Sequence, residues 1–210
     1  MKIELQNAGK RFNRDWIFRE VQLTIQTKER IAVTGANGTG KSTLLQVIAG
    51  NVSLNEGKIH WFSEKNISEE NIFQHLSIVA PYLEVIEEYT ATEFLQFHSY
   101  FKPLRKDISI AEILSIVGLK HAADKQIRFF SSGMKQRIKL AHAVFSAVPL
   151  LLLDEPCTNL DSEGYALYHS LIEKYCSDKT IVVSSNDVNE YDFCERKIAI
   201  TDYKMQKQFV

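Results

Sequence analysis

The stretch Gly35-Ala36-Asn37-Gly38-Thr39-Gly40-Lys41-Ser42-Thr43 decides the fold. It follows the apolar run 31–33 and precedes the helix-like run 44–49, so it fits the phosphate-loop pattern G-x-x-x-x-G-K-[ST] in its strand-loop-helix context. Glycines let backbone N–H groups point at an anion, and the following helix adds about half a positive charge. The stretch therefore predicts a nucleoside triphosphate site, in which Lys41 reaches the β- and γ-phosphates and the Ser42 hydroxyl holds Mg²⁺.

Composition and charge exclude several classes of protein. The chain has 210 residues, 45% of them hydrophobic, which is enough for one domain with a substantial core. A formal net charge of -1 gives no basic field for nucleic acid. Three cysteines without C-x-x-C spacing indicate neither a disulfide framework nor a zinc site, and favour a reducing cytosol. The N-terminus lacks a signal-peptide core and no apolar run reaches about 18 residues, so we expect any membrane role to come through a partner.

Alternating apolar residues predict antiparallel strands near the N-terminus, over 3–5, 21–25 and 58–62. A polar, hairpin-like connection is expected over 7–15. Phe12 and Trp16 lie in or beside it, and either ring could stack on an adenine or fold onto the sheet.

The middle of the chain predicts helices without strands. Thr90-x-x-Glu93 is typical of a capping box, and Asp107 is expected to cap a helix that runs to Gly118. The segment 82–123 is therefore interpreted as a helical insertion between two halves of an α/β core, with its crowded aromatic residues packing that insertion.

Two further motifs follow the insertion. Phe130-Ser131-Ser132-Gly133-Met134 precedes a helix that we expect Pro149 to end, and the apolar strand 150–155 ends in Asp154 and Glu155. In a parallel sheet these acids emerge at the edge that carries the phosphate loop. Asp154 suits Mg²⁺ binding, and Glu155 suits polarising an attacking water.

An amphipathic helix over 162–175 and a strand over 180–184 complete the predicted core. The strand ends at Ser185-Asn186-Asp187, again at the edge where ligands collect.

In this order and spacing, the motifs resemble those of the nucleotide-binding subunit of an ATP-binding cassette (ABC) transporter over nearly the whole chain. The segment 35–43 corresponds to Walker A, 130–134 to the signature, 150–155 to Walker B and 158–161 to the D-loop. The resemblance implies an α/β fold: a P-loop NTPase (RecA-like) core with an antiparallel β subdomain and a helical insertion subdomain. It implies one domain over 1–210, with 1–81 and 140–210 forming the core and 82–139 forming the helical insertion and signature.

The resemblance also implies ATP and Mg²⁺ as ligands and a head-to-tail dimer, either a homodimer or a heterodimer with another ABC ATPase subunit. The signature of one subunit then closes over the ATP of the other, and Phe12 becomes the favoured adenine platform over Trp16. The implied catalytic residues are Glu155, Lys41 and Asn186, and the implied metal ligands are Ser42 and Asp154. The implied nucleotide-binding residues are Phe12, Gly35, Ala36, Asn37, Gly38, Thr39, Gly40, Lys41, Ser42, Thr43, Ser131 and Gly133.

Four positions depart from the family pattern. Ser132 replaces a glycine and Met134 a glutamine, as in some polysaccharide-type exporters. Pro81 stands at the position aligned with the Q-loop glutamine, and proline offers no amide to a metal or phosphate. Asn186 replaces the switch histidine; it can donate a hydrogen bond but cannot carry charge. We therefore expect ATP binding and dimer closure with hydrolysis that is reduced or differently coupled.

Three functions remain open at this point. The leading one is a transport ATPase on the cytoplasmic face of the cell membrane, bound to an integral-membrane permease subunit whose helix enters a groove around 81–88. The alternatives are a soluble cassette ATPase acting on ribosomes or DNA, and an ATP-dependent clamp with weak hydrolysis. No nucleic-acid partner is expected, because the chain has neither a second cassette, a long coiled-coil insertion nor a basic tail. The signature and the lack of a C-terminal regulatory extension lean towards export, while the cargo stays undefined.

Overall fold

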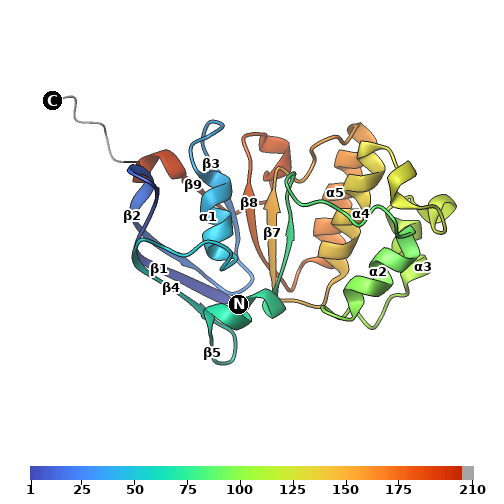
Figure 1. Ribbon diagram of the computed structural model, residues 1–210, viewed down its shortest axis with the longest axis horizontal. Helices are drawn as coiled ribbons and strands as arrows, with labels where there is room; N and C mark the ends of the chain where they lie inside the picture. Colours follow the sequence, from blue (N-terminus) through green and yellow to red (C-terminus); the bar gives the residue numbers. More distant parts are fainter. Residues whose placement is uncertain (205–210) are drawn as a thin grey trace.

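Two β-sheets form the framework of the protein, which a computed structural model describes over residues 1–204 (Figure 1). The predicted core segment 140–210 therefore includes six residues, 205–210, that lie outside the described residues. The antiparallel sheet has the order β2-β1-β4-β5, with bounds β1 Lys2–Phe12, β2 Asp15–Ile25, β4 Glu56–Phe62 and β5 Asn66–Ile67. The parallel sheet has the order β6-β7-β8-β3-β9, with bounds β3 Arg30–Thr34, β6 Leu76–Val79, β7 Leu150–Asp154, β8 Thr180–Ser184 and β9 Arg196–Ala199.

The helices divide between the two sides of the parallel sheet. The α-helices are α1 Lys41–Ile48, α2 Ala91–Ser99, α3 Ile110–Ile116, α4 Ser132–Phe145 and α5 Ser162–Tyr175. Short 3₁₀ helices connect them: η1 Glu69–His75, η2 Lys120–Ala122, η3 Ile127–Phe129, η4 Val188–Glu190 and η5 Ile200–Tyr203. Helix α1 lies between the two sheets, whereas α4 and α5 cover the other face of the parallel sheet and α2 and α3 lie beyond them (Figure 1). Within residues 1–204, no helix has the length and apolar content needed to cross a lipid bilayer.

The parallel sheet separates two hydrophobic cores. Successive side chains of a strand point to opposite faces, so Leu150 and Leu152 of β7 join the core around α1, and Leu151 and Leu153 join the core around α4 and α5. β8 alternates in the same way, with Val182 on the α1 side. A sheet that is covered on both faces explains the continuous apolar runs in these strands.

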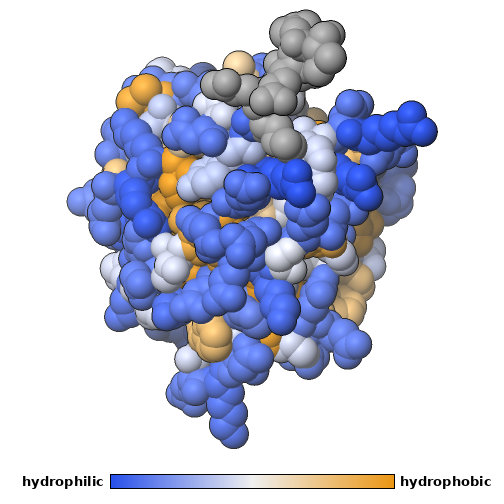
Figure 2. Space-filling view, turned by 90° about the vertical axis from the view of Figure 1, so that its left-hand side faces the viewer, coloured by the Kyte–Doolittle hydropathy of each residue, from blue (hydrophilic) through white to orange (hydrophobic). Residues whose placement is uncertain are grey.

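The face of the molecule formed by the antiparallel sheet is mainly hydrophilic, with hydrophobic residues visible in small separate areas (Figure 2). Two large aromatic side chains are exposed just after the end of α2: Tyr100 is 76% exposed and Phe101 is 65% exposed. These two residues therefore mark the helical end of the molecule as the better candidate for an apolar contact.

The predicted α/β fold with its antiparallel and helical parts is confirmed, and so are the helix 162–175, the strand 180–184 and the Thr90–Glu93 capping box. Three local predictions are wrong. Residues 7–15 are not a loop, because β1 continues to Phe12 through irregular pairing with β2. Asp107 does not cap α3; Ser109 does, in a capping box with Glu112. Helix α4 ends at Phe145, before Pro149.

Candidate functional site

The phosphate loop connects the end of β3 to the start of α1. Gly40, the N-cap of α1, has φ 108°, and a Cβ there would lie 2.3 Å from Cγ2 of Ile17, so no larger residue fits without a shift. Gly38 also has a positive φ of 73°, with open space where a side chain would be. The first turn of α1 contains no acidic residue that would offset the positive end of the helix. The loop therefore has the backbone conformation and the positive electrostatic potential of an anion site.

Lys41 lies in the mouth of this loop. Its Nζ donates to the carbonyl oxygens of Gly35, at 2.8 Å, and Ala36, at 3.4 Å, and the residue is only 4% exposed. Carbonyl oxygens are neutral acceptors, so the ammonium group has no carboxylate partner in these contacts and can exchange them for phosphate oxygens. Ser42 and Thr43, in the first turn of α1, are partly buried on the same helix end.

Two carboxylates lie at the end of β7. Asp154 is 2% exposed, and among the described residues its Oδ1 atom has no hydrogen-bond partner. Glu155 follows in a left-handed conformation with φ 45°, which costs a non-glycine residue of order 1–3 kcal/mol. Its N–H donates to the carbonyl of Ser184 at 2.9 Å, which holds the turn. A buried carboxylate oxygen that lacks a partner fits a bound cation, and Mg²⁺ needs few protein ligands when it travels with phosphates.

Asn186 lies between these acids and the phosphate loop. The reason is the strand order: β8 separates β7 from β3, so the loop after β8 emerges between the two motifs. The exposed Asn186 side chain donates from Nδ2 to Oδ1 of Asn37 at 2.7 Å. The structure thus brings together the loop, the acids and Asn186, all at the carboxyl edge of one sheet.

The signature residues form a separate hollow. Ser131 is the N-cap of α4, and its Oγ accepts from the N–H of Met134 at 3.3 Å. At Gly133 a Cβ would lie 3.2 Å from the carbonyl of Asn159, so the segment fits closely against the D-loop. The hollow measures about 360 Å³, and the residues that line it come from 118–121, 131–137 and 159–161 rather than from the phosphate loop. Ser131 and Gly133 are therefore not part of the same concavity as Lys41.

The two candidate aromatic platforms differ in exposure. Phe12 ends β1 and is 49% exposed, with the Lys10 ammonium 5.0 Å from its ring centroid. Trp16 is partly buried against Gly9, where a Cβ would lie 3.0 Å from its ring. The guanidinium groups of Arg11 and Arg19 also lie over the Trp16 ring, at 5.4 and 4.7 Å. Phe12 is the more accessible of the two rings.

Tyr82 is a site residue that the sequence reasoning missed. Pro81 and Tyr82 follow β6 and are both exposed. Partial burial raises the pKa of the Tyr82 phenol above its ordinary value, the charge of Asp154 adds to this, and a hydrogen bond with Gln46 opposes it. The Tyr82 hydroxyl, one residue beyond Pro81, is therefore near enough to Asp154 for its pKa to be affected by that charge. A polar side chain next to a proline at the end of a strand was the available signal.

Comparisons with known proteins agree with this arrangement. Residues 18–158 match the model of a family described as ABC transporter. The uncharacterized ABC transporter ATP-binding protein YybJ of Bacillus subtilis is 28% identical over 185 residues, covering 88% of this chain and 85% of that protein. The cytochrome c biogenesis ATP-binding export protein CcmA of Vibrio cholerae is 32% identical over 169 residues, covering 80% and 82%. A solved ATP-binding cassette, dimeric and bound to ADP and Pi, superimposes with a TM-score of 0.80 at 25% identity, covering 94% of this chain and 93% of that chain.

Proposed function

The chain belongs to the ABC transporter family as an ATP-binding subunit, and we propose that it hydrolyses ATP in a dimer that drives a membrane-spanning partner. The observation that carries the proposal is the convergence of the phosphate loop, the two β7 carboxylates and Asn186 at one edge of the parallel sheet. We also propose that the core comprises 1–81 and 140–210, with 82–139 as the helical insertion.

ATP binding rests on three groups of residues. The backbone of 35–43 cradles the β- and γ-phosphates, Lys41 exchanges its two carbonyl contacts for phosphate oxygens, and the exposed Phe12 ring stacks on the adenine. Ser42 and Asp154 are the residues that would hold Mg²⁺, which supplies charge neutralisation of the phosphates.

Hydrolysis requires a polarised water in line with the γ-phosphate. Glu155, whose strained turn sets it at the open end of β7, orients and polarises that water. Asn186 donates from Nδ2 to the γ-phosphate once it releases Asn37. An amide carries no charge and exchanges no proton, so we expect slower hydrolysis than a histidine would support.

A second subunit completes the site. Ser131 and Gly133 line a hollow that lies apart from the phosphate loop of the same chain, which supports a head-to-tail dimer in which they contact the γ-phosphate of the other copy. Both a homodimer and a heterodimer with a related subunit fit this geometry.

The membrane partner is proposed to dock in a groove of about 400 Å³ between the core and α2. Apolar residues of β6, the following segment and α2 line most of it, and the exposed Phe101 lies at its end. Lys102 and Lys139 add two positive charges to the lining and Glu84 adds one negative charge. Burial lowers the pKa of His142 to about 3, so this imidazole stays neutral near pH 7. A permease segment with an apolar face and an acidic residue fits such a lining. The subunit would then lie on the cytoplasmic face of the cell membrane.

Export is the direction we propose, supported by the Ser-Ser-Gly-Met signature and by the similarity to CcmA, which is named an export protein. An ATP-dependent clamp is the second candidate, favoured by Pro81 and Asn186 at positions where the family has glutamine and histidine. Phosphate release separates the two: steady release that Glu155→Gln abolishes supports the ATPase. ATP-dependent dimerisation without release supports the clamp, and co-purification with an integral-membrane protein tests the partner.

A further inference from the structure

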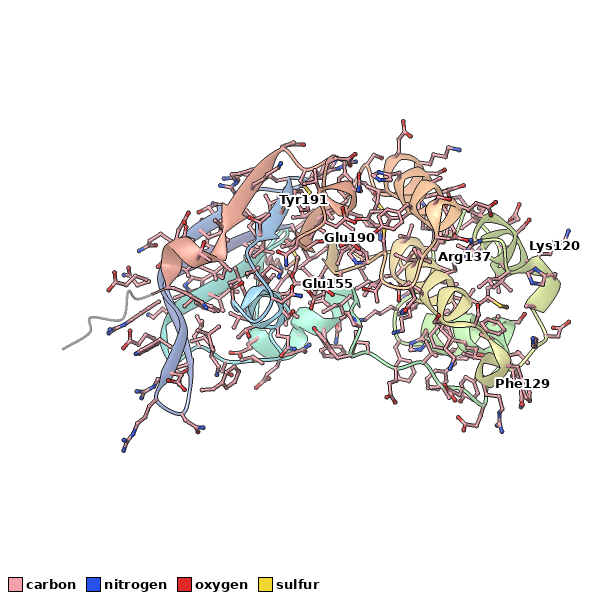
Figure 3. All side chains as sticks on the ribbon, turned by 90° about the horizontal axis from the view of Figure 1, so that it is seen from above. Lys120, Phe129, Arg137, Glu155, Glu190 and Tyr191 are labelled. Atoms are coloured by element: carbon pink, nitrogen blue, oxygen red, sulfur yellow. The ribbon has the colours of Figure 1, made fainter. Side chains whose placement is uncertain are left out.

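Glu190 is a buried carboxylate directly behind the candidate site. It ends the 3₁₀ helix η4, is 3% exposed, and accepts through Oε1 from the backbone N–H of Cys157 at 2.7 Å. Cys157 begins the segment that leads into the D-loop, two residues after Glu155. Figure 3 shows Glu190 and Glu155 close together near the middle of the molecule, and their charges are near enough to interact.

Glu190 also contacts the loop that carries Asn186. The nearby Ser185 hydroxyl favours the charged form of Glu190, which opposes the rise in its pKa, and Ser185 Oγ accepts from the N–H of Asp187 at 2.9 Å. Helix α5 fixes this loop from outside, because Tyr168 donates to the carbonyl of Glu190 and Tyr165 donates to Asp187, each at 2.8 Å. Glu190 is also tied to this loop through its backbone, because its N–H donates to the carbonyl of Asp187 at 3.0 Å. Its backbone is therefore held by α5 and by the Asn186 loop, while its side chain binds the segment that leads into the D-loop.

Each of these loops continues to a motif of the site. On one side, Gln136 of the signature helix α4 donates to the carbonyl of Pro156 at 2.6 Å, next to the Cys157 contact. On the other side, Asn186 donates to Asn37 of the phosphate loop. Glu190 lies between these two contacts, so a shift of the Asn186 loop has a hydrogen-bonded route to the D-loop and to α4.

A carboxylate in this place costs free energy that a neutral side chain avoids. Burial raises the pKa of Glu190, and the negative charges of Asp187 and Glu155 raise it further, although the Ser185 and Cys157 hydrogen bonds oppose them. The gain is geometric: an ionised carboxylate accepts a charge-assisted hydrogen bond from the Cys157 N–H, which is shorter and stronger than a neutral one.

We propose that Glu190 is a positioning residue that locks the D-loop to the Asn186 loop, so that a γ-phosphate contact at Asn186 sets the place of the D-loop and the signature helix. This role rests on the proposed ATPase function. Glu190 would link the nucleotide site of a subunit to the D-loop and signature surface that the same subunit presents to its partner.

Steady-state kinetics test the positioning role. We expect Glu190→Ala to lower kcat about tenfold or more while the KM for ATP changes less than about twofold, because the lost contacts orient groups rather than bind substrate. Glu190→Gln, which keeps a carbonyl acceptor for the Cys157 N–H, should restore kcat to within about threefold of wild type. Glu195→Ala, which removes an exposed glutamate from the same segment, is the matched control and should change neither constant.

The double variant Glu190→Ala, Asn186→Ala separates positioning from general damage. If Glu190 acts through Asn186, the double variant should be no slower than the slower single variant. Additive losses would overturn the proposal, as would an unchanged kcat in Glu190→Ala or a Glu190→Gln variant as slow as Glu190→Ala. If Glu190→Ala does not fold, Glu190→Asp, which is one methylene too short to reach Cys157, takes its place.

Hydrogen exchange provides a readout that does not depend on hydrolysis. Mg-ATP should slow amide exchange in both 156–161 and 185–190 of the wild type, but only in 185–190 of Glu190→Ala or Glu190→Asp. Equal slowing of 156–161 with and without Glu190 would overturn the inference and leave the ATPase proposal intact. A wild-type chain that neither releases phosphate nor changes its amide exchange with Mg-ATP would contradict both the role of Glu190 and the ATPase proposal.

Discussion

Asn186 donates a 2.7 Å hydrogen bond to Asn37, which joins the end of β8 directly to the phosphate loop. The contact uses the amide that we propose for the γ-phosphate, so nucleotide binding must exchange one hydrogen bond for another. Such an exchange costs little, because the phosphate oxygen is the charged and therefore the stronger acceptor. We therefore expect the Asn186–Asn37 hydrogen bond to be present in the empty site and absent when the γ-phosphate is bound.

The first prediction concerns Asn186 itself. Asn186→His should raise kcat about tenfold or more, because an imidazole is both a donor and a group that can carry charge, and one lost transition-state donor costs about 10²- to 10³-fold. Asn186→Ala should be slower than wild type. Phosphate release under saturating Mg-ATP measures kcat for both variants. A fast wild type whose kcat does not change in Asn186→His would show that the asparagine does not slow hydrolysis.

Glu155→Gln should abolish turnover and trap the ATP-bound dimer. The amide cannot polarise water, and loss of a general base typically costs about 10²-fold or more. Light scattering after gel filtration with Mg-ATP should show a dimer for this variant. Adding Lys41→Ala should return it to a monomer, since the phosphate loop then loses its cation. A Glu155→Gln chain that stays monomeric with Mg-ATP would contradict the composite site.

Phe12→Ala should weaken ATP binding by about 5- to 150-fold, which corresponds to the roughly 1–3 kcal/mol that base stacking contributes. Phe12→Tyr keeps the ring and should bind ATP normally. Trp16→Ala should have the smaller effect on affinity, because that ring packs against Gly9 and two arginines. Calorimetric titration gives the three affinities, and the opposite ranking would assign the adenine to Trp16.

Glu190 makes stability depend on pH with a defined sign. Its raised pKa means that the folded state binds the proton more tightly, so its contribution to stability is present below the unfolded pKa of about 4.3 and is lost as the pH rises through the folded pKa. Glu190→Gln should therefore raise Tm at about pH 8 and lose this advantage towards about pH 4.

The groups that face Glu190 leave this sign unchanged. Burial raises the pKa values of Cys157 and Tyr168, which stay neutral over that interval, and Asp187 and Glu155 add negative charge. Thermal unfolding of wild type, Glu190→Gln and the exposed control Glu195→Gln at the two pH values checks the prediction. An equal difference in Tm at both would refute it.

Ser109→Ala should destabilise the helical insertion by about 1 kcal/mol, the usual cost of losing an N-cap. Asp107→Ala should cost clearly less stability than Ser109→Ala, because the exposed Asp107 pairs with Arg105 only at the surface. Urea unfolding of both variants compares them directly, and a larger loss for Asp107→Ala would reassign the cap.

The elements that sequence reasoning predicted well carry their signals locally. The strand of the phosphate loop, β7, β8 and α5 each have an apolar run or period bounded by turn or capping residues. β6 and β9 were not predicted: each has four residues, and β9 begins with the charged Arg196 and Lys197. The predicted strand at the start of β1 is too short, because the polar stretch that begins at Asn7 resembles a turn in sequence. In the structure Asn7 has φ 47° and lies beside a register shift, and the strand continues past it.

The sequence predicts the acids and Asn186 at the edge of the sheet that carries the phosphate loop, but not the contacts between these groups. Lys41, Asp154 and Glu155 follow from motif spacing, yet the contact between Asn186 and Asn37 depends on the insertion of β8 between β7 and β3. Strand order is a property of the whole chain, and no local pattern contains it. Glu190 was missed for the related reason that its partners, Cys157 and Ser185, come together only in the folded sheet.

The alternation along β7 has a practical consequence for protein engineering. Leu150 and Leu152 face one core and Leu151 and Leu153 the other, so the two cores share a wall but no packed side chains across it. Substitutions on opposite faces should have nearly additive effects on stability, and either core can be redesigned while the other is kept as a fixed template. An engineer who wishes to stabilise this cassette can therefore optimise the α1 side and the α4–α5 side in separate libraries and combine the results.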